Sequence, residues 1–226
     1  MSGAEVVHGG CSSDGHLQRS RTASPPHSLK EVLGSAAWSR LPESVQVRFA
    51  KKATAVDYVG EFDVVRASLL GRMIAWGCRA IGTPVVPHTG RNVPAIVHVI
   101  PSGRGVEWCR EYRWPSRSPC LVRSTKVIDA EGTVIEELPA GLRMSLQVYE
   151  ETGILHFVSH AYYFELRIPG IQWRARLVLP RWLSPGTTHV EHIDQAEGWF
   201  KFTMTVTHPL FGETFYQTGR FHASGD

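Results

Sequence analysis

The chain has 226 residues, of which 42% are hydrophobic and 20% are charged, and its formal net charge is +3. These values are ordinary for a globular protein, so they exclude wholesale disorder and favour one sizeable domain over two. Because Lys and Arg are spread along the chain, the small basic excess does not favour nucleic-acid binding.

The cysteines and the apolar runs bear on the cellular compartment. Cys11, Cys78, Cys109 and Cys120 lack CxxC spacing and have no histidines at zinc-finger distance, which argues against a cysteine metal site and fits reduced thiols. The first thirty residues contain no signal-like apolar run, and no stretch of eighteen apolar residues occurs. We therefore expect a cytoplasmic protein without membrane insertion.

The N-terminal segment, residues 1–32, is rich in Ser, Gly, His and Arg and has hardly any bulky apolar residues. Such a segment cannot bury enough surface to offset the entropy cost of ordering, so we expect a disordered tail. Its histidines, His8, His16 and His27, are interpreted as tail composition rather than as metal ligands. Residues 33–226 are expected to form a single β-rich domain with a ligand pocket.

Two helices are expected at the start of this domain. Pro42 and Glu43 are typical of a helix start, and Val45 and Phe49 recur at i and i+4, which predicts a short helix to about Lys52. A second helix is indicated by an apolar stripe at spacings of three and four residues, made of Val65, Leu69, Met73, Trp76 and Ala80.

The rest of the chain changes its hydrophobic period from 3.6 to 2. Between Phe200 and Val206, for example, apolar residues alternate with Lys and Thr, as in a half-buried strand. Turn signals such as Glu131-Gly132 and Thr152-Gly153 separate the runs. After an extended segment at 56–62, strands are predicted at residues 95–100, 107–114, 120–128, 133–138, 142–148, 154–166, 171–179, 200–206 and 215–222.

These runs predict the fold class. Because no helix-length segment interrupts them, a parallel βαβ architecture is excluded. We predict a mainly β member of the α+β class: an antiparallel meander of seven to nine strands, strongly curved or closed like a barrel, with the two N-terminal helices packed on it or plugging it. Such a barrel has an interior that side chains fill or that holds one small ligand.

The order of several segments resembles a known family. These segments are LPESVQVRF, GCRAIGTPVVPHTGRNVP, EWCREYRW, GTVIEELPAGLRMSL, LVLPRWLSPGTTHVEHI and GWFKFTMTVTHPLFGETFYQTGRF. Over about residues 40–222 they resemble the bacterial family called domain of unknown function 4166, whose members are often attached behind a saccharopine-dehydrogenase-like Rossmann domain. The resemblance implies one domain with a shared site and carries no established activity.

The stretch EWCREYRW places a cation in an aromatic row. In a strand, Trp108, Arg110 and Tyr112 share one face, because alternate residues point to opposite faces. Glu136 also lies between apolar residues in its own run, so both charged groups are expected to face inward, where they can pair. Two interpretations stay open: the pair orients a ligand, or it is a structural ion pair that fixes strand register.

A second group of candidates lies on the strand predicted at residues 154–166. His156, His160 and Tyr162 share one parity, and histidine titrates near neutrality, so we assign these residues to ligand binding or proton transfer. The opposite parity, which includes Phe157 and Tyr163, is equally apolar. The face that carries the histidines is therefore also a candidate for the outer face.

The segment THVEHID suggests a metal site, which we reject at this stage. In a strand, His189 and Glu191 share a face while His192 lies on the opposite one, and in a helix the three residues spread around the axis. Three ligands therefore do not converge, and no metal is expected. Glu191 alone is expected to point inward as a catalytic acid or base.

Further candidates come from the last turn and from the tryptophans. His208, in a turn signal before the final strand, is a candidate general base or a turn cap, and Tyr216 is a candidate ligand contact. Trp108 and Trp173 are expected among the pocket walls, because aromatic rows can line a site for a flat or apolar ligand. Neither GxSxG, nor a P-loop, nor a GxGxxG before a helix occurs, so we expect no cofactor.

The sequence thus predicts a barrel that binds a hydrophobic small molecule, with Arg110, Glu136, Glu191 and His208 as candidate catalytic residues. A cofactor-independent cyclase, isomerase or lyase of a biosynthetic intermediate would need only shape and acid or base groups. The alternatives are a non-catalytic carrier of lipids or metabolites and an accessory module of a dehydrogenase. A homodimer is left open.

Overall fold

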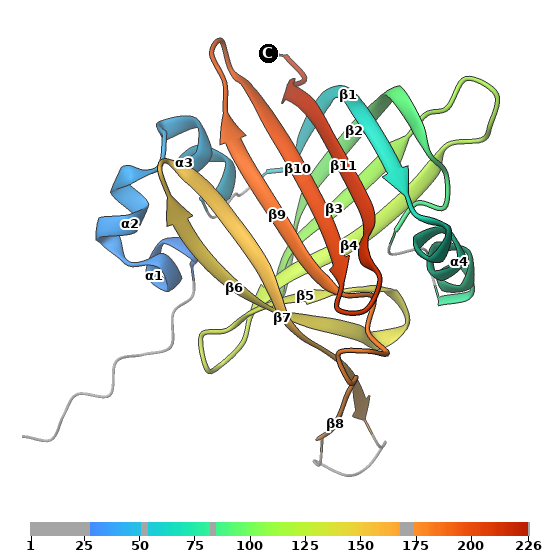
Figure 1. Ribbon diagram of the computed structural model, residues 1–226. Helices are drawn as coiled ribbons and strands as arrows, with labels where there is room; N and C mark the ends of the chain where they lie inside the picture. The colour runs from blue at the N-terminus through green and yellow to red at the C-terminus, as the bar shows by residue number, and fades with distance from the viewer. Residues whose placement is uncertain (1–27, 51–53, 82–84, 168–173, 226) are drawn as a thin grey trace, which may run out of the picture.

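The computed structural model describes residues 28–50, 54–81, 85–167 and 174–225 (Figure 1). Antiparallel strands dominate these ranges. They are β1 (Val56–Ala67), β2 (Gly90–Ser102), β3 (Gly105–Tyr112), β4 (Cys120–Ile128), β5 (Val134–Glu137), β6 (Leu142–Glu151), β7 (Ile154–Arg167), β8 (Arg174–Val178), β9 (Thr187–Asp194), β10 (Trp199–His208) and β11 (Gly212–Ala223).

The strands close into a barrel. Their order is β6-β5-β4-β3-β2-β1-β11-β10-β9-β7-β8, and β6 also pairs with β7, so that every strand except β8 belongs to a closed ring. The predicted closed antiparallel sheet is confirmed. The strand number exceeds the predicted seven to nine, because the extended segment at 56–62 is part of the 12-residue strand β1 and the THVEHID segment forms β9.

The barrel interior is filled mainly by aromatic and branched side chains. Phe62 of β1 stacks on Tyr112 of β3 with ring centroids 4.7 Å apart, and its ring also meets Phe202 of β10 and Phe221 of β11. These residues come from the continuous run of strands β3-β2-β1-β11-β10, so the curved sheet packs its inward side chains against one another.

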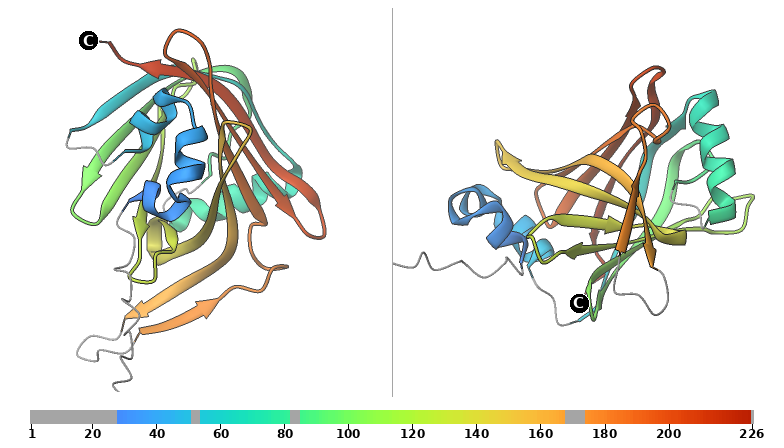
Figure 2. Two further views of the ribbon diagram at one scale, coloured as in Figure 1. Left: turned by 90° about the vertical axis from the view of Figure 1, so that its left-hand side faces the viewer. Right: turned by 90° about the horizontal axis from the view of Figure 1, so that it is seen from below.

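Three short helices cover one end of the barrel: α1 (Leu29–Leu33), α2 (Ser35–Arg40) and α3 (Glu43–Phe49). Ser28 caps α1 by accepting a hydrogen bond from the Glu31 backbone N–H. Trp38 and Val45 are buried against the barrel core. Figure 2 (left) shows these helices in front of the barrel opening, and α3 confirms the first predicted helix.

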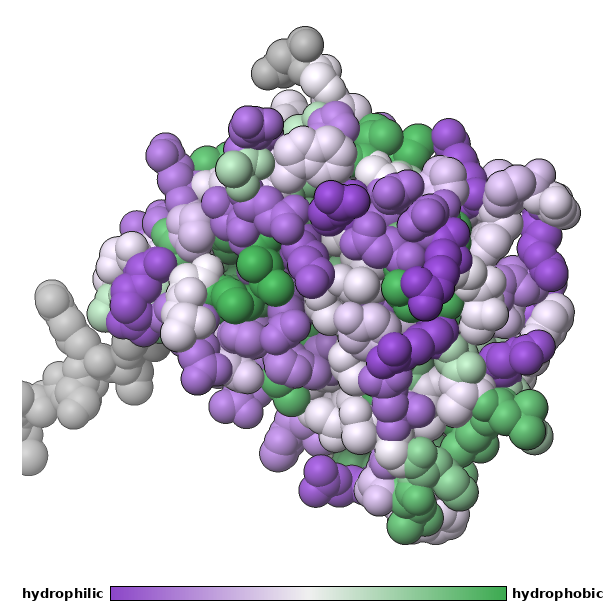
Figure 3. All heavy atoms as spheres, turned by 45° about the horizontal axis from the view of Figure 1, so that its top comes forward, coloured by the Kyte–Doolittle hydropathy of each residue, from purple (hydrophilic) through white to green (hydrophobic). Residues whose placement is uncertain are grey.

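The second predicted helix is shorter than its apolar stripe. Val65 belongs to β1, and the helix α4 (Leu69–Gly77) starts after it and continues into the 3₁₀ turn η1 (Cys78–Ile81). Leu69, Met73 and Trp76 are 75%, 64% and 48% exposed, so the helix packs on the barrel with most of its apolar stripe facing outward. Figure 3 shows apolar side chains gathered on the side of the molecule where α4 lies.

Small residues explain why α4 turns its stripe outward. Gly71 and Ala75 are its buried residues, and α4 packs against β11 and β1. A Cβ added to Gly71 would collide with the carbonyl oxygen of Thr214 on β11. The helix backbone therefore rests directly on the sheet, which a face of large side chains would prevent.

The structure also bears on the expected N-terminal tail, on the expected reduced cysteines and on the expected lack of a membrane-spanning helix. Helix α1 begins at Leu29, before residue 33, while residues 1–27, with His8, His16 and His27, lie outside the described ranges. Cys78, Cys109 and Cys120 are free thiols. Among the residues placed by the structure, no helix is long and apolar enough to cross a membrane.

The close approach of α4 predicts the effect of one methyl group. Although Ala favours helices over Gly by roughly 1 kcal/mol, Gly71→Ala should lower the free energy of unfolding by about 1–3 kcal/mol, because the added Cβ overpacks the contact with Thr214. Gly77→Ala on the same helix is the control, since nothing lies within 4 Å of its added Cβ. Urea denaturation measures both, and equal effects would contradict the docking geometry.

Candidate functional site

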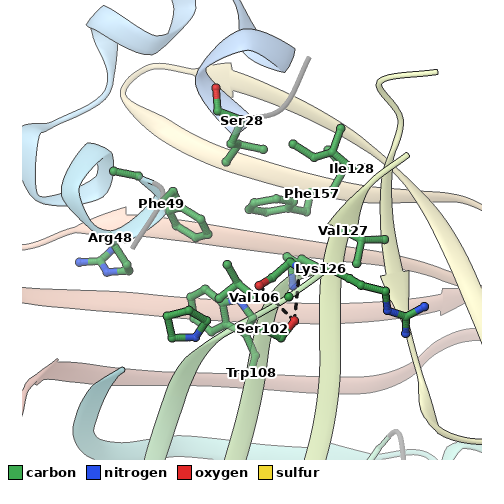
Figure 4. A pocket seen from close by; sticks show the side chains of 17 residues that line it. Ser28, Arg48, Phe49, Ser102, Val106, Trp108, Lys126, Val127, Ile128 and Phe157 are labelled. Atoms are coloured by element: carbon green, nitrogen blue, oxygen red, sulfur yellow. Dashed lines mark hydrogen bonds between the residues drawn. The ribbon is translucent and has the colours of Figure 1, made fainter. Parts of the chain in front are cut away.

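A cavity of about 550 Å³ lies at the barrel end that α1 and α3 cover (Figure 4). Its walls come from the end of α3, the β2–β3 turn, the end of β4 and neighbouring strands, and most are apolar. The apolar lining includes Phe49, Val106, Trp108, Val134 and Phe157. The volume lies within the roughly 300–1,000 Å³ of small-molecule sites.

One histidine lies within a group of aromatic rings beside the cavity. The ring of His192 has its centroid between 4.7 and 6.2 Å from the centroids of five rings. These rings, which with His192 we call the aromatic cluster, belong to Phe49, Trp108, Phe157, Phe200 and Phe202. Three of them also line the cavity, so the cluster forms part of its wall.

His192 is neutral at neutral pH. Its burial lowers its pKa well below the ordinary value, and the charges of Arg48, Lys126 and Arg110 lower it further. Its Nδ1 is buried without a hydrogen-bond partner among the described residues. A neutral imidazole with an unused nitrogen thus lies buried behind the cavity lining.

A buried ion pair lies next to the aromatic cluster. Lys126 Nζ is 3.1 Å from Glu136 Oε2, and the two side chains are 14% and 7% exposed. The ammonium group is also 5.5 Å from the centroid of the Trp108 ring and 5.4 Å from that of Phe157. Lys126 lines the cavity, so this pair brings charge to its apolar wall.

The pKa values of this pair move in directions set by burial and by neighbouring charges. Burial lowers the pKa of Lys126, the charge of Glu136 offsets part of that, and Arg110 adds to the lowering. Burial alone would raise the pKa of Glu136, but Lys126, Arg110 and a hydrogen bond from Ser124 outweigh it and hold this pKa below the usual value. Glu136 is therefore a carboxylate, and Lys126 gives up its proton more readily than a lysine in water.

Arg110 and Glu136 face the interior, as predicted. Arg110 is 8% exposed, and its guanidinium carbon lies 5.6 Å from the centroid of the Phe202 ring. The ion-pair partner of Glu136 is nevertheless Lys126, while Arg110 acts on the carboxylate through its charge. Trp108 lines the cavity, whereas Tyr112 is fully buried core and donates a hydrogen bond of 2.8 Å to Gln217.

A third interior cation comes from α3. The guanidinium carbon of Arg48 lies 3.6 Å from the centroid of the Phe200 ring. Burial lowers the pKa of Arg48 to about 10, against the raising effects of Tyr58 and Asp194, so Arg48 keeps its charge at neutral pH. Arg48 lines the cavity on the α3 side (Figure 4).

A β-bulge divides the strand that carries His156, His160 and Tyr162. Ser145 pairs with Ala161 but Leu146 pairs with Ser159, so His160 is the extra residue of β7. Tyr162 faces the interior, where its hydroxyl lies 2.7 Å from Thr188 Oγ1. His156 faces outward and His160 is exposed, so the three residues do not share one face, and the outer-face alternative holds for the two histidines.

Other candidates lie away from the cavity. Glu191 was expected to point inward, but its neighbour His192 occupies the inner face and the Glu191 side chain is 30% exposed on the outer one. Tyr216 also faces outward, with the Arg66 guanidinium carbon 4.3 Å from its ring centroid. Trp173 lies outside the described residues.

His208 adopts the turn-capping alternative. The backbone N–H of Leu210 donates to His208 Nδ1 at 3.2 Å, which leaves Nε2–H to donate to the Trp182 carbonyl oxygen at 3.1 Å. Both ring nitrogens are therefore used in holding a turn. A general base needs a nitrogen free to accept a proton, so this geometry gives no support to a catalytic role for His208.

Sequence reasoning missed Lys126, Arg48, Phe49 and His192 as site residues. Lys126 shares the parity of Val122 and Ser124, a signal that could have placed it inside. His192 shares its parity with Val190, but the preference for an inward acid placed Glu191 inside instead. For Arg48 and Phe49 the sequence holds no such signal, because it does not tell which helix covers the barrel opening.

The Lys126–Glu136 pair predicts a large and coupled stability effect. Lys126→Met leaves the Glu136 carboxylate buried without its ion-pair partner, and we expect a loss of about 3–5 kcal/mol in the free energy of unfolding. The double variant K126M/E136Q should lose less than the sum of the two single variants. Urea denaturation of the four proteins measures the coupling, and additive losses would contradict a direct interaction.

The lowered pKa of His192 predicts a pH dependence. Below the unfolded-state pKa of about 6.5, the unfolded chain takes up a proton that folded His192 does not, so acid favours unfolding. Between pH 7 and 5, the free energy of unfolding of the wild type should fall more steeply than that of H192N, by up to about 1.4 kcal/mol per pH unit.

The matched control for this measurement is H160N, which removes an exposed histidine of β7 and should keep the wild-type slope. Chemical denaturation at several pH values gives the three slopes. Equal slopes for the wild type and H192N would mean that His192 is protonated equally in the folded and unfolded states.

Comparison with known proteins identifies a family match. The family model described as "Domain of unknown function (DUF4166)" matches residues 41–221, which include α3 and nearly the whole barrel. No curated protein and no solved structure matches the chain. Since the family description names no activity, the function has to be inferred from the cavity and its charges.

Proposed function

The chain belongs to the DUF4166 family, and from its cavity we propose that the barrel binds a hydrophobic small molecule that carries an anionic or electron-rich oxygen group. Lys126, placed at the wall of an otherwise largely apolar cavity, is the observation that supports this most (Figure 4). Apolar walls with a few polar groups that fix orientation are typical of small-molecule sites.

The balance of charge supports an electron-rich ligand group. Arg48, Arg110 and Lys126 are the cations whose fields reach His192, and Glu136 forms an ion pair with Lys126. Arg48 lines the cavity, and its Nε and Nη1 are buried without a hydrogen-bond partner among the described residues. A buried charge is costly unless it is paired, so a ligand oxygen that pairs with a cation would lower the free energy of the complex.

A second candidate function is proton transfer on the bound molecule. Lys126 is an ammonium group with a lowered pKa beside an ionised carboxylate, so it can donate a proton to one atom of the ligand and, as the resulting amine, accept a proton from another. Arg110 can stabilise negative charge that develops between these steps. Isomerisation or cyclisation of this kind needs no cofactor, and it assigns roles to Lys126, Glu136 and Arg110 rather than to Glu191 or His208.

Titration calorimetry with decanoate and decan-1-ol tests the binding proposal. The two probes share a chain length and differ in the carboxylate, so decanoate should bind roughly tenfold or more tightly, as a charge-assisted hydrogen bond predicts. Lys126→Met should reduce this preference. Absence of binding for both probes, or equal affinities, would contradict the proposed ligand class.

A pair of tryptophan variants tests whether binding occurs in the cavity. Val106→Trp adds bulk to a cavity-lining side chain and should abolish decanoate binding. Ile100→Trp places a tryptophan at an outward, 41% exposed residue of β2, the strand that pairs with β3, and should leave binding unchanged. Loss of binding in both variants would mean that the probe binds outside the cavity.

A turnover assay with biosynthetic intermediates distinguishes an enzyme from a carrier. Recovery of every tested intermediate unchanged after tight binding would favour a carrier.

A further inference from the structure

A second cluster of ligand-type side chains lies on the outer face of the barrel, where β7 pairs with β9. His156 stands opposite Glu191 across the two strands, and His189 stands opposite Val158. His156 Nδ1 is 3.0 Å from His189 Nε2 and 3.8 Å from Glu191 Oε1. The ligand atoms of all three residues lie within 4.8 Å of one another.

From this convergence we propose that His156, His189 and Glu191 form a binding site for a divalent transition-metal ion, with Zn²⁺ as the best match. Two imidazoles and one carboxylate are a ligand set of zinc sites that have three protein ligands and keep the fourth position for water. Mg²⁺ and Ca²⁺ prefer all-oxygen sites, so the two imidazoles select against them. His189 and Glu191 are half-buried, so water can reach the fourth position.

The distances need only a small adjustment. Two ligand atoms on one tetrahedral zinc, each bonded at about 2.1 Å, lie roughly 3.4 Å apart. The His156–His189 distance of 3.0 Å is slightly shorter and the His156–Glu191 distance of 3.8 Å slightly longer. The side chain of Glu191 is 30% exposed, which leaves it room to rotate toward the imidazoles.

The surroundings favour a bound cation. His156 is 5% exposed and stacks on Tyr149 with ring centroids 4.7 Å apart, which fixes its orientation. The carboxylates of Glu191, Glu151 and Glu150 act on this imidazole through their charge.

One of these carboxylates, that of Glu150, is paired with a positively charged neighbour. Arg40 donates a hydrogen bond of 2.6 Å to Glu150 and neutralises its charge. Glu191 and Glu151 remain, so the field at the imidazoles stays negative. The positive interior charges of Lys126 and Arg110 lie on the other side of the wall, because their strands direct them inward.

The cluster spans the short pairing between β7 and β9, so a bound metal would affect the stability of the barrel. β7 pairs with β9 only from Leu155 to Val158, and its later residues pair with β8 instead. An ion held by His156 on one strand and by His189 and Glu191 on the other would link the two strands at this short contact. Bound Zn²⁺ should therefore raise the melting temperature of the full chain, since a ligand that binds the folded state stabilises it.

Titration of the full-length protein with Zn²⁺ and Co²⁺ tests the site. Calorimetry should give one Zn²⁺ per chain, and Co²⁺ should give the visible absorption of a tetrahedral N/O site. His189→Ala and Glu191→Gln should each weaken Zn²⁺ binding by at least about tenfold. His160→Ala is the matched control, because it removes an exposed histidine of β7 that is outside the cluster.

Circular dichroism of each variant checks that the barrel is folded, which is expected for Glu191→Gln because this residue lies on the outer surface. Unchanged Zn²⁺ affinity in a folded H189A/E191Q double variant would overturn the proposal and would indicate binding by other histidines, such as those of the N-terminal segment. Equal losses in His160→Ala, or absence of binding at micromolar Zn²⁺, would overturn it as well. Zn²⁺ binding with the expected losses, and unchanged decanoate binding, would support a site independent of the cavity.

Discussion

The pairing of β6 with β7 is the constraint on which the rest of the structure depends. It runs from Leu142 opposite Phe164 to Glu151 opposite Ile154, and it joins the two ends of the strand order into a ring. Closure removes the exposed edges that an open sheet of this size would present. It also surrounds an interior from which water is largely excluded, and this gives the charges of Arg110, Lys126 and Glu136 their strong mutual effects.

One irregularity in that pairing decides which side chains reach the interior. The bulge at His160 lets β7 direct Phe157 inward before it and Tyr162 inward after it, although these residues have opposite parities. In a regular strand without this bulge, Phe157 and Tyr162 would point to opposite faces of the sheet. The same bulge leaves His156 on the outer face, where β9 presents His189 and Glu191 beside it.

The sequence predicted the features that depend on local pattern. A closed antiparallel sheet, the helix α3 and the inward direction of Arg110 and Glu136 follow from hydrophobic periodicity, and periodicity is a property of neighbours along the chain. Features that depend on which segments meet were not predictable in this way. The outward direction of the apolar stripe of α4 is one such feature, because no local pattern in the sequence shows that Gly71 must approach β11 so closely.

The differences at the candidate sites have the same origin. The segment THVEHID places His189 and Glu191 on one face, and His156, which lies beside them, comes from another strand 33 residues earlier than His189. Likewise, Glu136 was matched to Arg110 because both lie in apolar rows, whereas strand register sets Lys126 directly opposite Glu136. Pairing across strands is set by closure and register, and a single sequence does not encode these in its local pattern.

The buried charges argue that the interior has a role beyond stability. A buried ion pair contributes little net stability, because the cost of removing both charges from water can exceed their attraction, and apolar residues of the same volume often serve a fold equally well. This barrel nevertheless holds Arg48, Arg110, Lys126 and Glu136 around a neutral histidine, beside a cavity that is otherwise largely apolar. Departures from the apolar pattern are expected where a protein binds or transforms a ligand. These charged groups gather beside the cavity, and the ligand binding proposed above rests on that placement.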